Sequence, residues 1–356
     1  MLKHEPSTAM PKISVILTSF NHESYIREAI ESVLYQTFSD FELIIWDDAS
    51  TDASWSIIQE YKDPRVKAFR NETSRRAIYG VNRSIGEVAK GEFIAMHHSD
   101  DVWRVDKLAV QLALLQERCD VGAVFTGVEV IDEAGVAVTD ENVFYTKVFD
   151  PENKKRHQWL RKFFLQGNAL CHPSVLVRKQ CYDKCGLYRY GLAQVGDFDM
   201  WIRLCMQYEI HVVPEPLVKF RFHAGGGNTS AIKPETRRRI PYEYFEILDT
   251  FLEIANVEDV IQIFPEACEY IRESNADTRY LLARIAIEKR PFVFSPLWGQ
   301  MILFSMLNEP SAARRLEEWH GFTYIDFIQL SGMSDVFGYD EIARLRAELA
   351  GGVDGR

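Results

Sequence analysis

The chain has 356 residues, of which 47% are hydrophobic, and it carries a formal net charge of -11 at pH 7. This length and composition are typical of a soluble globular protein of roughly two domains, each with a sizeable core. The acidic balance argues against a general nucleic-acid binder, because contacts to phosphates require clustered Lys and Arg side chains.

Residues 1–11 are predicted to be a disordered lead-in, after which apolar runs alternate with amphipathic segments. Residues 13–18 predict a strand, a polar loop follows at 19–23, and apolar residues then recur at helical spacing from 26 to 34. The same unit repeats, with strands at 41–46, 66–69 and 93–96 and helices near 55–61 and at 78–89. Alternating β and α segments predict a mostly parallel sheet with helices on both faces and right-handed crossovers.

Polar loops follow the first, second and fourth of these strands. The carboxyl ends of parallel strands lie at one edge of a sheet, where α/β proteins bind ligands, so we expect the three loops to form one site. Asp100 and Asp101 follow the fourth strand, as a carboxylate pair placed to hold a hard divalent cation against a diphosphate. The alternative is that Ser99 or Asp100 only caps the following turn.

The second half of the chain has fewer regular signals. Helices are expected at 106–117 and 195–206, and strands at 121–130, at the end of 168–178, and on either side of Pro214-Glu215-Pro216 within 211–222. After Pro234 the strand signals nearly vanish, and helices are expected at 240–255, 257–274, 278–288, 311–319 and 339–349. We therefore predict a boundary between a domain at 12–232 and a helical region at 233–356.

The six cysteines have neither CxxC spacing nor a paired framework, and the first residues do not resemble a signal peptide, which predicts reduced thiols in the cytosol. The longest apolar segment, 292–307, is interrupted by Pro296, Gly299 and Gln300 and is shorter than the roughly 20 residues of a membrane span. It predicts a buried helix, with an interfacial membrane contact as the alternative.

The stretch PKISVILTSFNHESYIREAIESVLYQTFSDFELIIWDDASTD, at 11–52, resembles the amino-terminal signature of the inverting family 2 glycosyltransferases. Weaker matches follow in order in GEFIAMHHSDD, NALCHPSVLVR, VGDFDMWIRL and FRFH, so the resemblance covers roughly 12–225. The pattern is especially similar to the spore-coat polysaccharide type. It implies an α/β GT-A nucleotide-diphospho-sugar transferase fold, with a Rossmann-like, mostly parallel sheet, followed by a C-terminal all-α region.

The resemblance assigns the nucleotide-sugar pocket to the loops after the first two strands and to two flanking positions, namely Thr18, Phe20, Asn21, Asp48, Arg76 and Asp100. A carboxylate at Asp48 can accept the N3–H of uracil or thymine, which cytosine lacks, and Phe20 can stack on the base. Arg76 can pair with the base or with a phosphate, and Asp100 lies near the ribose. We therefore expect a UDP- or dTDP-sugar donor.

In the family's acidic motif, Asp101 matches the carboxylate that binds Mn²⁺ or Mg²⁺ between the two phosphates. Such a metal stabilises the charge that develops on the leaving nucleoside diphosphate. Many members begin this motif with a further Asp, where this chain has His98, which is either a ligand or a packing residue at a strand end. His223 matches a histidine that some members place on the metal or pyrophosphate, and its alternative role is that of a loop residue.

An inverting transferase needs one carboxylate to take the proton of the acceptor hydroxyl as its oxygen attacks the anomeric carbon. Asp197 matches this general base and Asp199 is the second choice, while both could instead be first-turn acids of a helix. Gly196 stands where most members have an acidic residue that often contacts the acceptor. His172 and Ser174 are expected on the acceptor side, or else in a structural turn.

These observations predict a metal-dependent inverting glycosyltransferase that moves one sugar in a single displacement, without a covalent intermediate. The chain lacks a QxxRW motif, which favours addition of one residue over polymerisation. The set of motifs suggests a bacterial source and a glycan acceptor that is a lipid-linked precursor of surface polysaccharide, O-antigen or capsule. The protein is then expected in the cytoplasm, with peripheral contact at the inner membrane face as an option. Lys233, Arg237, Arg238 and Arg239 would then contact anionic lipid, and the alternative is that they form a solvated helix face.

Two alternatives come from other classes of protein. A non-catalytic sugar-nucleotide-binding or scaffold subunit is supported by His98 and Gly196, since both replace acidic residues expected at the centre of the site. A nucleotidyltransferase would need a Gly- and Arg/Lys-rich triphosphate loop after the first strand, and the loop at 19–23 does not provide one.

Overall fold

The computed structural model describes residues 10–225, 228, 231, 233–272 and 275–351. The chain divides into two compact units, one made of Met1–Phe163 with Gly167–Glu243 and the other of Phe164–Gln166 with Tyr244–Arg356. Most of the predicted lead-in, residues 1–9, and the predicted boundary at residue 232 lie outside the described residues. The division into domains at that point stays a prediction.

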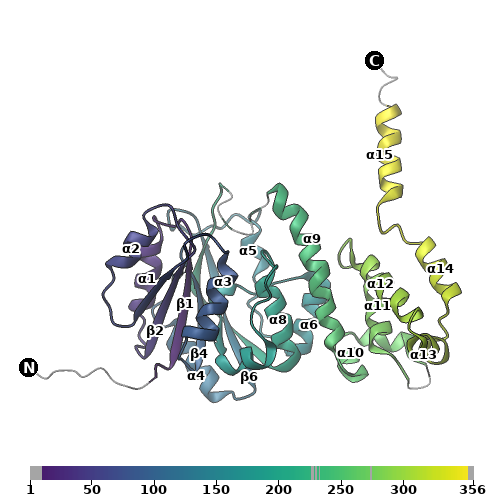
Figure 1. The fold of residues 1–356 in the computed structure, drawn as a ribbon, viewed down its shortest axis with the longest axis horizontal. Helices are drawn as coiled ribbons and strands as arrows, with labels where there is room; N and C mark the ends of the chain where they lie inside the picture. The colour runs from purple at the N-terminus through teal and green to yellow at the C-terminus, as the bar shows by residue number, and fades with distance from the viewer. Residues whose placement is uncertain (1–9, 226–227, 229–230, 232, 273–274, 352–356) are drawn as a thin grey trace, which may run out of the picture. The chain divides into compact units, whose positions relative to one another are not determined.

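An eight-stranded sheet forms the centre of the first unit (Figure 1). In chain order its strands are β1 (Ile13–Ser19), β2 (Phe41–Asp47), β3 (Val66–Arg70), β4 (Phe93–His98), β5 (Val102–Trp103), β6 (Val121–Ile131), β7 (Leu176–Arg178) and β8 (Glu209–Arg221). Their spatial order is β3-β2-β1-β4-β7-β6-β8-β5. The first four strands are parallel to their neighbours among themselves, as β6 is to β8, while β7 and β5 pair antiparallel. The predicted mostly parallel sheet is confirmed.

Helices cover both faces of this sheet. They are α1 (Ile26–Leu34), α2 (Ser54–Glu60), α3 (Ala77–Arg83), α4 (Lys107–Glu117), α5 (Tyr145–Val148), α6 (Arg156–Gln166), α7 (Lys179–Cys185) and α8 (Gly196–Gln207). Alternate residues of β1, such as Val15 and Leu17, are fully buried in one apolar cluster with Ile30 of α1, Ile58 of α2 and Leu112 of α4. Figure 1 shows α1 and α2 on one side of β1 and β2 and α3 on the other. Because β1 and β2 are buried on both faces, their sequences are nearly continuous apolar runs, and the buried Ser14 and Glu42 that interrupt them are hydrogen-bonded to each other.

The two short strands expected around Pro214-Glu215-Pro216 are in fact one strand, β8, so that prediction was wrong. The partner strand β6 shifts register at Thr126/Gly127 and again at Gly127/Val128, opposite these prolines. A β-bulge tolerates proline because its extra residue makes no ladder hydrogen bond. Gly127 is required there, since a Cβ atom would lie 2.3 Å from the carbonyl oxygen of Pro214.

The helix predicted at 78–89 is also different in detail. It begins as α3 and continues from Ser84 to Val88 as a π-helical turn. The short 3-10 turn η2 (His172–Ser174) precedes β7, which matches the structural turn that the sequence offered as an alternative for these residues.

After Pro234 all regular elements of the described residues are helical, which confirms the C-terminal all-α region. They are α9 (Pro234–Leu248), η3 (Asp249–Glu253), α10 (Val257–Ile263), η4 (Pro265–Tyr270), α11 (Thr278–Lys289), α12 (Ser295–Leu307), α13 (Pro310–His320), α14 (Tyr324–Gly332) and α15 (Tyr339–Gly351). The helix expected at 257–274 ends early because Pro265 cannot continue it. No helix was predicted at α14. Within the part of the chain that the structure describes, no helix is both long and apolar enough to span a bilayer.

The first part of α9 packs with the first unit. The carboxylate of Glu243 is fully buried and accepts hydrogen bonds from the backbone N–H groups of Ala193, Gln194 and Val195, at 2.8, 2.7 and 3.0 Å. This contact holds the loop before α8, which borders the cavity described next.

Candidate active site

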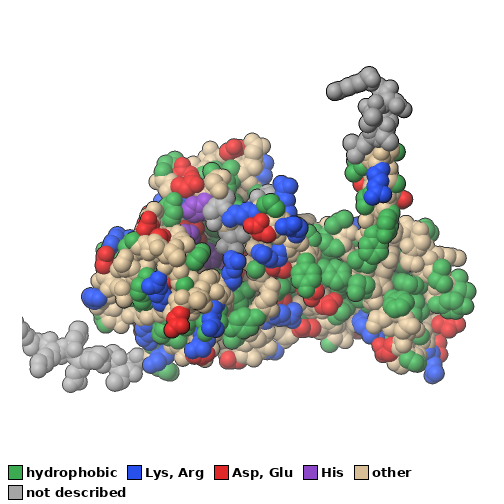
Figure 2. Space-filling view, turned by 45° about the horizontal axis from the view of Figure 1, so that its top comes forward, with side chains coloured by type: hydrophobic (Ala, Val, Ile, Leu, Met, Phe, Trp, Pro, Cys, Tyr) green, Lys and Arg blue, Asp and Glu red, His purple; other side chains and the backbone are tan. Residues whose placement is uncertain are grey.

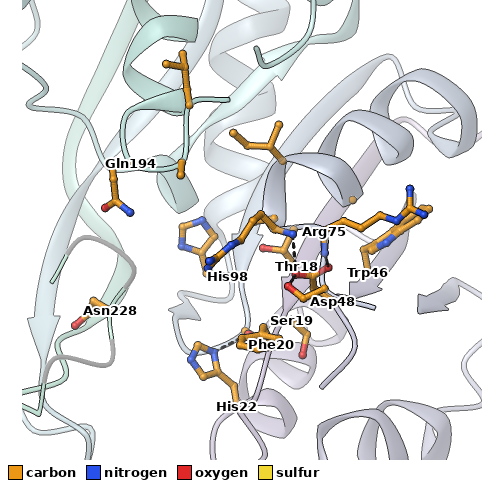
Figure 3. Close-up of a pocket in the computed structure, with 18 of the residues that line it drawn as sticks. Thr18, Ser19, Phe20, His22, Trp46, Asp48, Arg75, His98, Gln194 and Asn228 are labelled. Carbon is orange, nitrogen blue, oxygen red and sulfur yellow. Dashed lines mark hydrogen bonds between the residues drawn. The ribbon is translucent and has the colours of Figure 1, made fainter. Parts of the chain in front are cut away.

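A cavity of about 430 Å³ lies at the carboxyl ends of β1, β2 and β4. Its walls come from the loops after these strands, from the segment at 74–80, from the loop at 190–194, and from Phe220, Asn228 and Arg239. Figure 3 shows Trp46, Asp48 and Arg75 on one side, Gln194 and Asn228 on the opposite side, and His98 between them. The three polar loops therefore surround one cavity, as predicted, and its role as a binding site stays a prediction.

Thr18, Phe20, Asp48, Arg76 and Asp100 all line this cavity, as the sequence predicted for a ligand pocket. Phe20 keeps 48% of its surface exposed, so one face of its ring is available for stacking. Whether these side chains bind a nucleotide-sugar stays a prediction.

The carboxylate of Asp48 is buried and organises the adjoining loop. Its Oδ1 accepts hydrogen bonds from Nδ2 of Asn71 and from the backbone N–H of Arg75, both at 2.7 Å. Its Oδ2 accepts from the hydroxyl of Ser74 at 2.6 Å and from the backbone N–H of Arg76 at 2.9 Å. These bonds use all of the roughly four acceptor positions of a carboxylate. A base N3–H can therefore bind Asp48 only if one of these donors moves away.

Trp46 forms an aromatic wall of the cavity. Its ring stacks on Phe69 with centroids 5.1 Å apart, and its Nε1–H donates to Oδ1 of Asn71 at 2.9 Å. Gly80 of α3 allows this packing, because a Cβ atom there would lie 2.6 Å from two ring carbons of Trp46. A larger residue at position 80 would have to displace the wall.

Three of the four described non-glycine residues with positive φ, namely Asn21, Ala49 and Arg76, lie in loops beside the cavity. Such conformations each cost roughly 1–3 kcal/mol and persist only where other contacts hold them. Asn21 does not line the cavity. Its side-chain oxygen accepts from the backbone N–H of Thr51 at 2.8 Å, and its own N–H donates to the hydroxyl of Ser50 at 2.9 Å. Asn21 thus ties the loop after β1 to the loop after β2.

Asp100 lies between two histidines at the edge of the cavity. His223 Nε2 is 3.0 Å from Asp100 Oδ2, His22 Nδ1 is 3.9 Å from Oδ1, and the two imidazole rings stack with centroids 5.9 Å apart. Burial acts to raise the pKa of Asp100, but the hydrogen bond with His223 and the nearby His22 outweigh it and lower the pKa. Burial lowers the pKa of His22. An ionised Asp100 beside a neutral His22 is the protonation state that metal ligands require.

Asp101 is only 1% exposed and does not line the cavity. Its Oδ1 accepts from the backbone N–H of Arg221 at 2.9 Å, and its Oδ2 has no hydrogen-bond partner and lies 3.5 Å from His98 Nδ1. Burial, followed by the neighbouring Asp100 carboxylate, raises the pKa of Asp101 to about 6. The assignment of Asp101 as the metal ligand stays a prediction, and Asp100 is the carboxylate that faces the cavity.

Behind Asp101 a chain of polar contacts runs into the interior. His98 Nε2 lies 3.0 Å from His172 Nδ1, and His172 Nε2 lies 2.9 Å from the hydroxyl of Tyr188. Burial opposes a charge on His98, but its contact with Asp101 outweighs that effect and raises its pKa. Burial, and then His98, lower the pKa of His172 well below its usual range. His98 thus both lines the cavity and connects it to this chain.

Asp197 lies in the first turn of α8. Its Oδ2 accepts from Nδ2 of Asn168 at 3.1 Å, and its Oδ1 accepts from the backbone N–H of Phe198 at 2.8 Å. Burial raises the pKa of Asp197 to about 6. This carboxyl is therefore poised to exchange a proton close to neutral pH. A Cβ atom at Gly196 would lie 2.9 Å from Cδ1 of Ile78, the end of a flexible side chain that can move aside, so this contact alone does not require glycine.

The residues that line the cavity do not include Asp197, Asp199, His172 or Ser174. Asp199 is fully buried in ion pairs with Arg203 at 2.7 Å and Arg189 at 3.1 Å. Ser174 is also fully buried, and its hydroxyl donates to the carbonyl of Cys171 at 2.7 Å. These contacts match the alternative roles given above, Asp199 as a first-turn acid of a helix and Ser174 as part of a structural turn. The acceptor-side roles of both residues stay predictions.

Two groups of side chains among the described residues could hold a metal ion, His22 with Asp100 and His223, and His98 with Asp100 and Asp101. In each group one possible ligand atom per residue lies within 4.8 Å of the others. The unpartnered Asp101 Oδ2 belongs to the second group. A divalent cation at either place would satisfy buried carboxylate oxygens, so the residues fit such an ion.

Sequence reasoning missed two residues that shape this site. His22 lies in the loop after β1, together with Phe20. The argument that residues of this loop line the site applies to His22 as well, so the sequence could have identified it. Arg221 is 2% exposed, donates from Nε to the carbonyl of Asp100 at 2.8 Å, and pairs with Glu28 at 2.8 Å. Burial of this guanidinium has no signal in the sequence, because the pattern of β8 does not show which side chains turn inward.

Comparison with known proteins assigns the chain to a family. Residues 14–178 match the sequence profile of glycosyl transferase family 2. The chain is 30% identical to the uncharacterized glycosyltransferase MJ1057 of Methanocaldococcus jannaschii over 230 residues, which is 63% of this chain and 76% of that protein. The chain belongs to glycosyltransferase family 2.

The chain is also similar to a named transferase and to a solved structure. The Escherichia coli UDP-Glc:alpha-D-GlcNAc-diphosphoundecaprenol beta-1,3-glucosyltransferase WfgD is 32% identical over 139 residues, 38% of this chain and 54% of that protein. The crystal structure of S. aureus TarS 1-349 in complex with UDP-GlcNAc aligns with a TM-score of 0.57 and 18% identity, covering 83% of this chain and 85% of that chain. This likeness shows that the family 2 chain has the GT-A fold, as its sequence predicted.

Proposed function

We propose that this glycosyltransferase transfers a single sugar from a UDP- or dTDP-sugar to a carbohydrate acceptor, with inversion, in one displacement. The proposal rests mainly on Asp197. Burial raises the pKa of this carboxyl to about 6, and the same unit contains the cavity that Asp100 faces. A base with this pKa is largely ionised at neutral pH and still takes up a proton readily.

The donor side of the cavity suits a nucleotide. Phe20 and Trp46 offer aromatic surface for a base, and Arg75 and Arg76 offer charge to phosphates. A uracil or thymine ring would displace one donor from Asp48, the hydroxyl of Ser74 being the one that costs least to move. TarS, which shares the fold, was crystallised with UDP-GlcNAc, and this supports a uridine donor.

Asp100 would hold the divalent cation, Mn²⁺ or Mg²⁺, with His223 and His22 or with Asp101 and His98 as further ligands. Bound there, a cation supplies positive charge that stabilises the leaving diphosphate. Arg221 keeps Asp100 in place through its backbone carbonyl.

In the transfer step the acceptor oxygen forms the new bond to the anomeric carbon while the bond to the diphosphate oxygen breaks. Asp197 takes the hydroxyl proton, and the nucleoside diphosphate leaves with the bonding electron pair. Asn168 holds one carboxylate oxygen and the N–H of Phe198 holds the other, so the base is oriented before the acceptor binds. An α-linked donor would give a β-linked product.

The acceptor is proposed to be a glycan, as in a lipid-linked precursor of a surface polysaccharide, at the inner face of the membrane. The names of WfgD and of the teichuronic acid biosynthesis relative TuaG support this class of acceptor. Peripheral contact with anionic lipid remains proposed for Lys233, Arg237 and Arg238, which are exposed. Arg239 lines the cavity instead, so its charge is better placed for a phosphate of the donor.

The donor assignment is tested by calorimetric titration with UDP, dTDP, CDP and GDP in the presence of Mn²⁺. UDP or dTDP should bind at least about 10-fold more tightly than CDP and GDP, a difference of roughly 1.4 kcal/mol. Equal affinity for all four nucleotides would contradict recognition of the base. Tight, selective binding without any turnover of sugar nucleotides would instead support the alternative, a non-catalytic binding subunit.

A further inference from the structure

The helices of the second unit expose an unusual amount of apolar surface, visible in green in Figure 2. On α12, Met301 and Phe304 are 53% and 58% exposed, although the sequence predicted this helix to be buried. On the neighbouring α14, Tyr324, Ile325 and Ile328 are 52–65% exposed. The rings of Phe304 and Phe327, 6.0 Å apart, join the two helices into one patch. Apolar surface of this extent usually marks an interaction site.

Helix α15 shows the same feature more strongly. All of its described side chains, at 339–348, are exposed, including Tyr339, Ile342 and Leu345. An isolated helix of this length is only marginally stable in water, because most helical stability in proteins comes from packing of an apolar face. The sequence of α15 therefore implies a surface that covers Ile342 and Leu345.

The pattern of α15 fits a second copy of the same helix. With Ile342 at heptad position a, Leu345 falls at d, Glu341 at g and Arg346 at e. A β-branched residue at a with Leu at d favours a parallel pair of helices, and in such a pair g of one helix lies opposite the following e of the other. Glu341 would then face Arg346 of the partner subunit, and the same ion pair would form twice.

The exposed apolar area and the charge of this region favour a second copy of the chain over a lipid surface as the binding partner. The exposed apolar side chains of α14, α15 and their connection would bury roughly 800 Å² per chain, which is the size of a standard protein interface. The region 324–348 is acidic, with Asp326, Asp335, Asp340, Glu341 and Glu348 against Arg344 and Arg346. An anionic membrane would repel this charge, whereas the pairing of Glu341 with Arg346 uses it.

We propose that the protein forms a two-fold dimer in which α15 pairs in parallel with α15 of a second copy and the apolar patch of α12 and α14 adds to the contact. This interface is independent of the proposed glycosyl transfer. It concerns the second unit only.

Sedimentation analysis of the full chain over a range of concentrations tests the dimer. The wild type should sediment as a dimer at micromolar concentration, and Ile342→Asp with Leu345→Asp should weaken dimerisation by about 100-fold or more, since four apolar side chains per dimer are lost. Ala347→Asp is the matched control, because position f faces away from the seam and the dimer should persist. Circular dichroism checks that each variant remains folded.

Charge reversal tests the parallel register. Glu341→Arg alone and Arg346→Glu alone should each weaken the dimer, because each places like charges opposite one another, and the double variant should restore it. A wild type that is monomeric at all concentrations would overturn the proposal. So would a dimer that the Ile342 and Leu345 changes leave intact, or a double variant that is weaker than both single ones.

Discussion

Replacing Asp197 by Asn should abolish transfer and yet stabilise the fold at alkaline pH. Burial raises the pKa of Asp197 from 3.8 to about 6, so the folded state binds a proton more tightly than the unfolded chain does. The ionised group therefore lowers the free energy of unfolding above about pH 6, by at most about 3 kcal/mol for a shift of this size. As the pH falls from about 6 this cost shrinks, and it disappears only below about pH 3, where the group is protonated in both states.

Asparagine has the same shape but no charge to bury. It can still accept from the N–H of Phe198, but its amide NH₂ faces the side-chain nitrogen of Asn168, which takes back part of the gain. We therefore expect Asp197→Asn to raise the free energy of unfolding by about 1–2 kcal/mol at pH 8 and by nearly nothing at about pH 3. The same variant should lose roughly 10²–10⁴-fold in transfer rate, which is the usual contribution of a general base.

Urea denaturation of wild type and variant at both pH values measures this difference, and the rate of sugar transfer is measured on the same samples. A variant that is destabilised equally at both pH values would show that Asp197 is an ordinary first-turn acid of α8 with no buried charge. A stabilised variant that keeps full transfer activity would refute its role as the base. Asp199→Asn is the control, since that carboxylate pairs with Arg203 and its loss should destabilise the fold.

Further predictions follow from other parts of the site. Asp48→Ala should weaken UDP binding by roughly 10- to 100-fold in calorimetry, because four donors of the adjoining loop lose their acceptor; unchanged affinity would exclude it from the donor site. Removal of divalent ions with EDTA should abolish transfer, Mn²⁺ should restore it, and Asp100→Ala should lose Mn²⁺ binding in calorimetry, whereas full activity in EDTA would exclude a required metal. Gly80→Val should lower the free energy of unfolding by about 1–3 kcal/mol, because its Cβ would displace Trp46; a wild-type thermal midpoint would refute that packing. Transfer should rise with pH through about 6 and then level off, as ionisation of Asp197 requires, and a rate that falls over this range would contradict the assigned base.

The sequence alone predicted the framework of the site for a clear physical reason. Parallel strands buried on both faces must be nearly continuous apolar runs, so β1, β2 and β4 were recognisable, and the polar residues that follow them had to share one edge. The family resemblance added predicted roles to Asp48, Asp100 and Asp197.

Side-chain direction could not be predicted in the same way. Asp100 and Asp101 are adjacent in sequence, yet Asp100 faces the cavity while Asp101 turns toward His98, because the backbone turn after β4 sets each direction. The burial of Arg221 likewise depends on partners from distant segments. The continuous β8 was missed because its prolines are permitted only by a bulge, whose extra residues lie on β8 opposite Gly127 of the partner strand.

The most direct test of the central claim is release of nucleoside diphosphate from a panel of UDP-, dTDP- and GDP-sugars with Mn²⁺ or Mg²⁺, with and without a mixed glycan acceptor. The account predicts release from a UDP- or dTDP-sugar that rises when an acceptor is added and that both Asp100→Ala and Asp197→Asn abolish. If no sugar nucleotide turns over under any of these conditions, although one binds, the claim that this site transfers a sugar is contradicted.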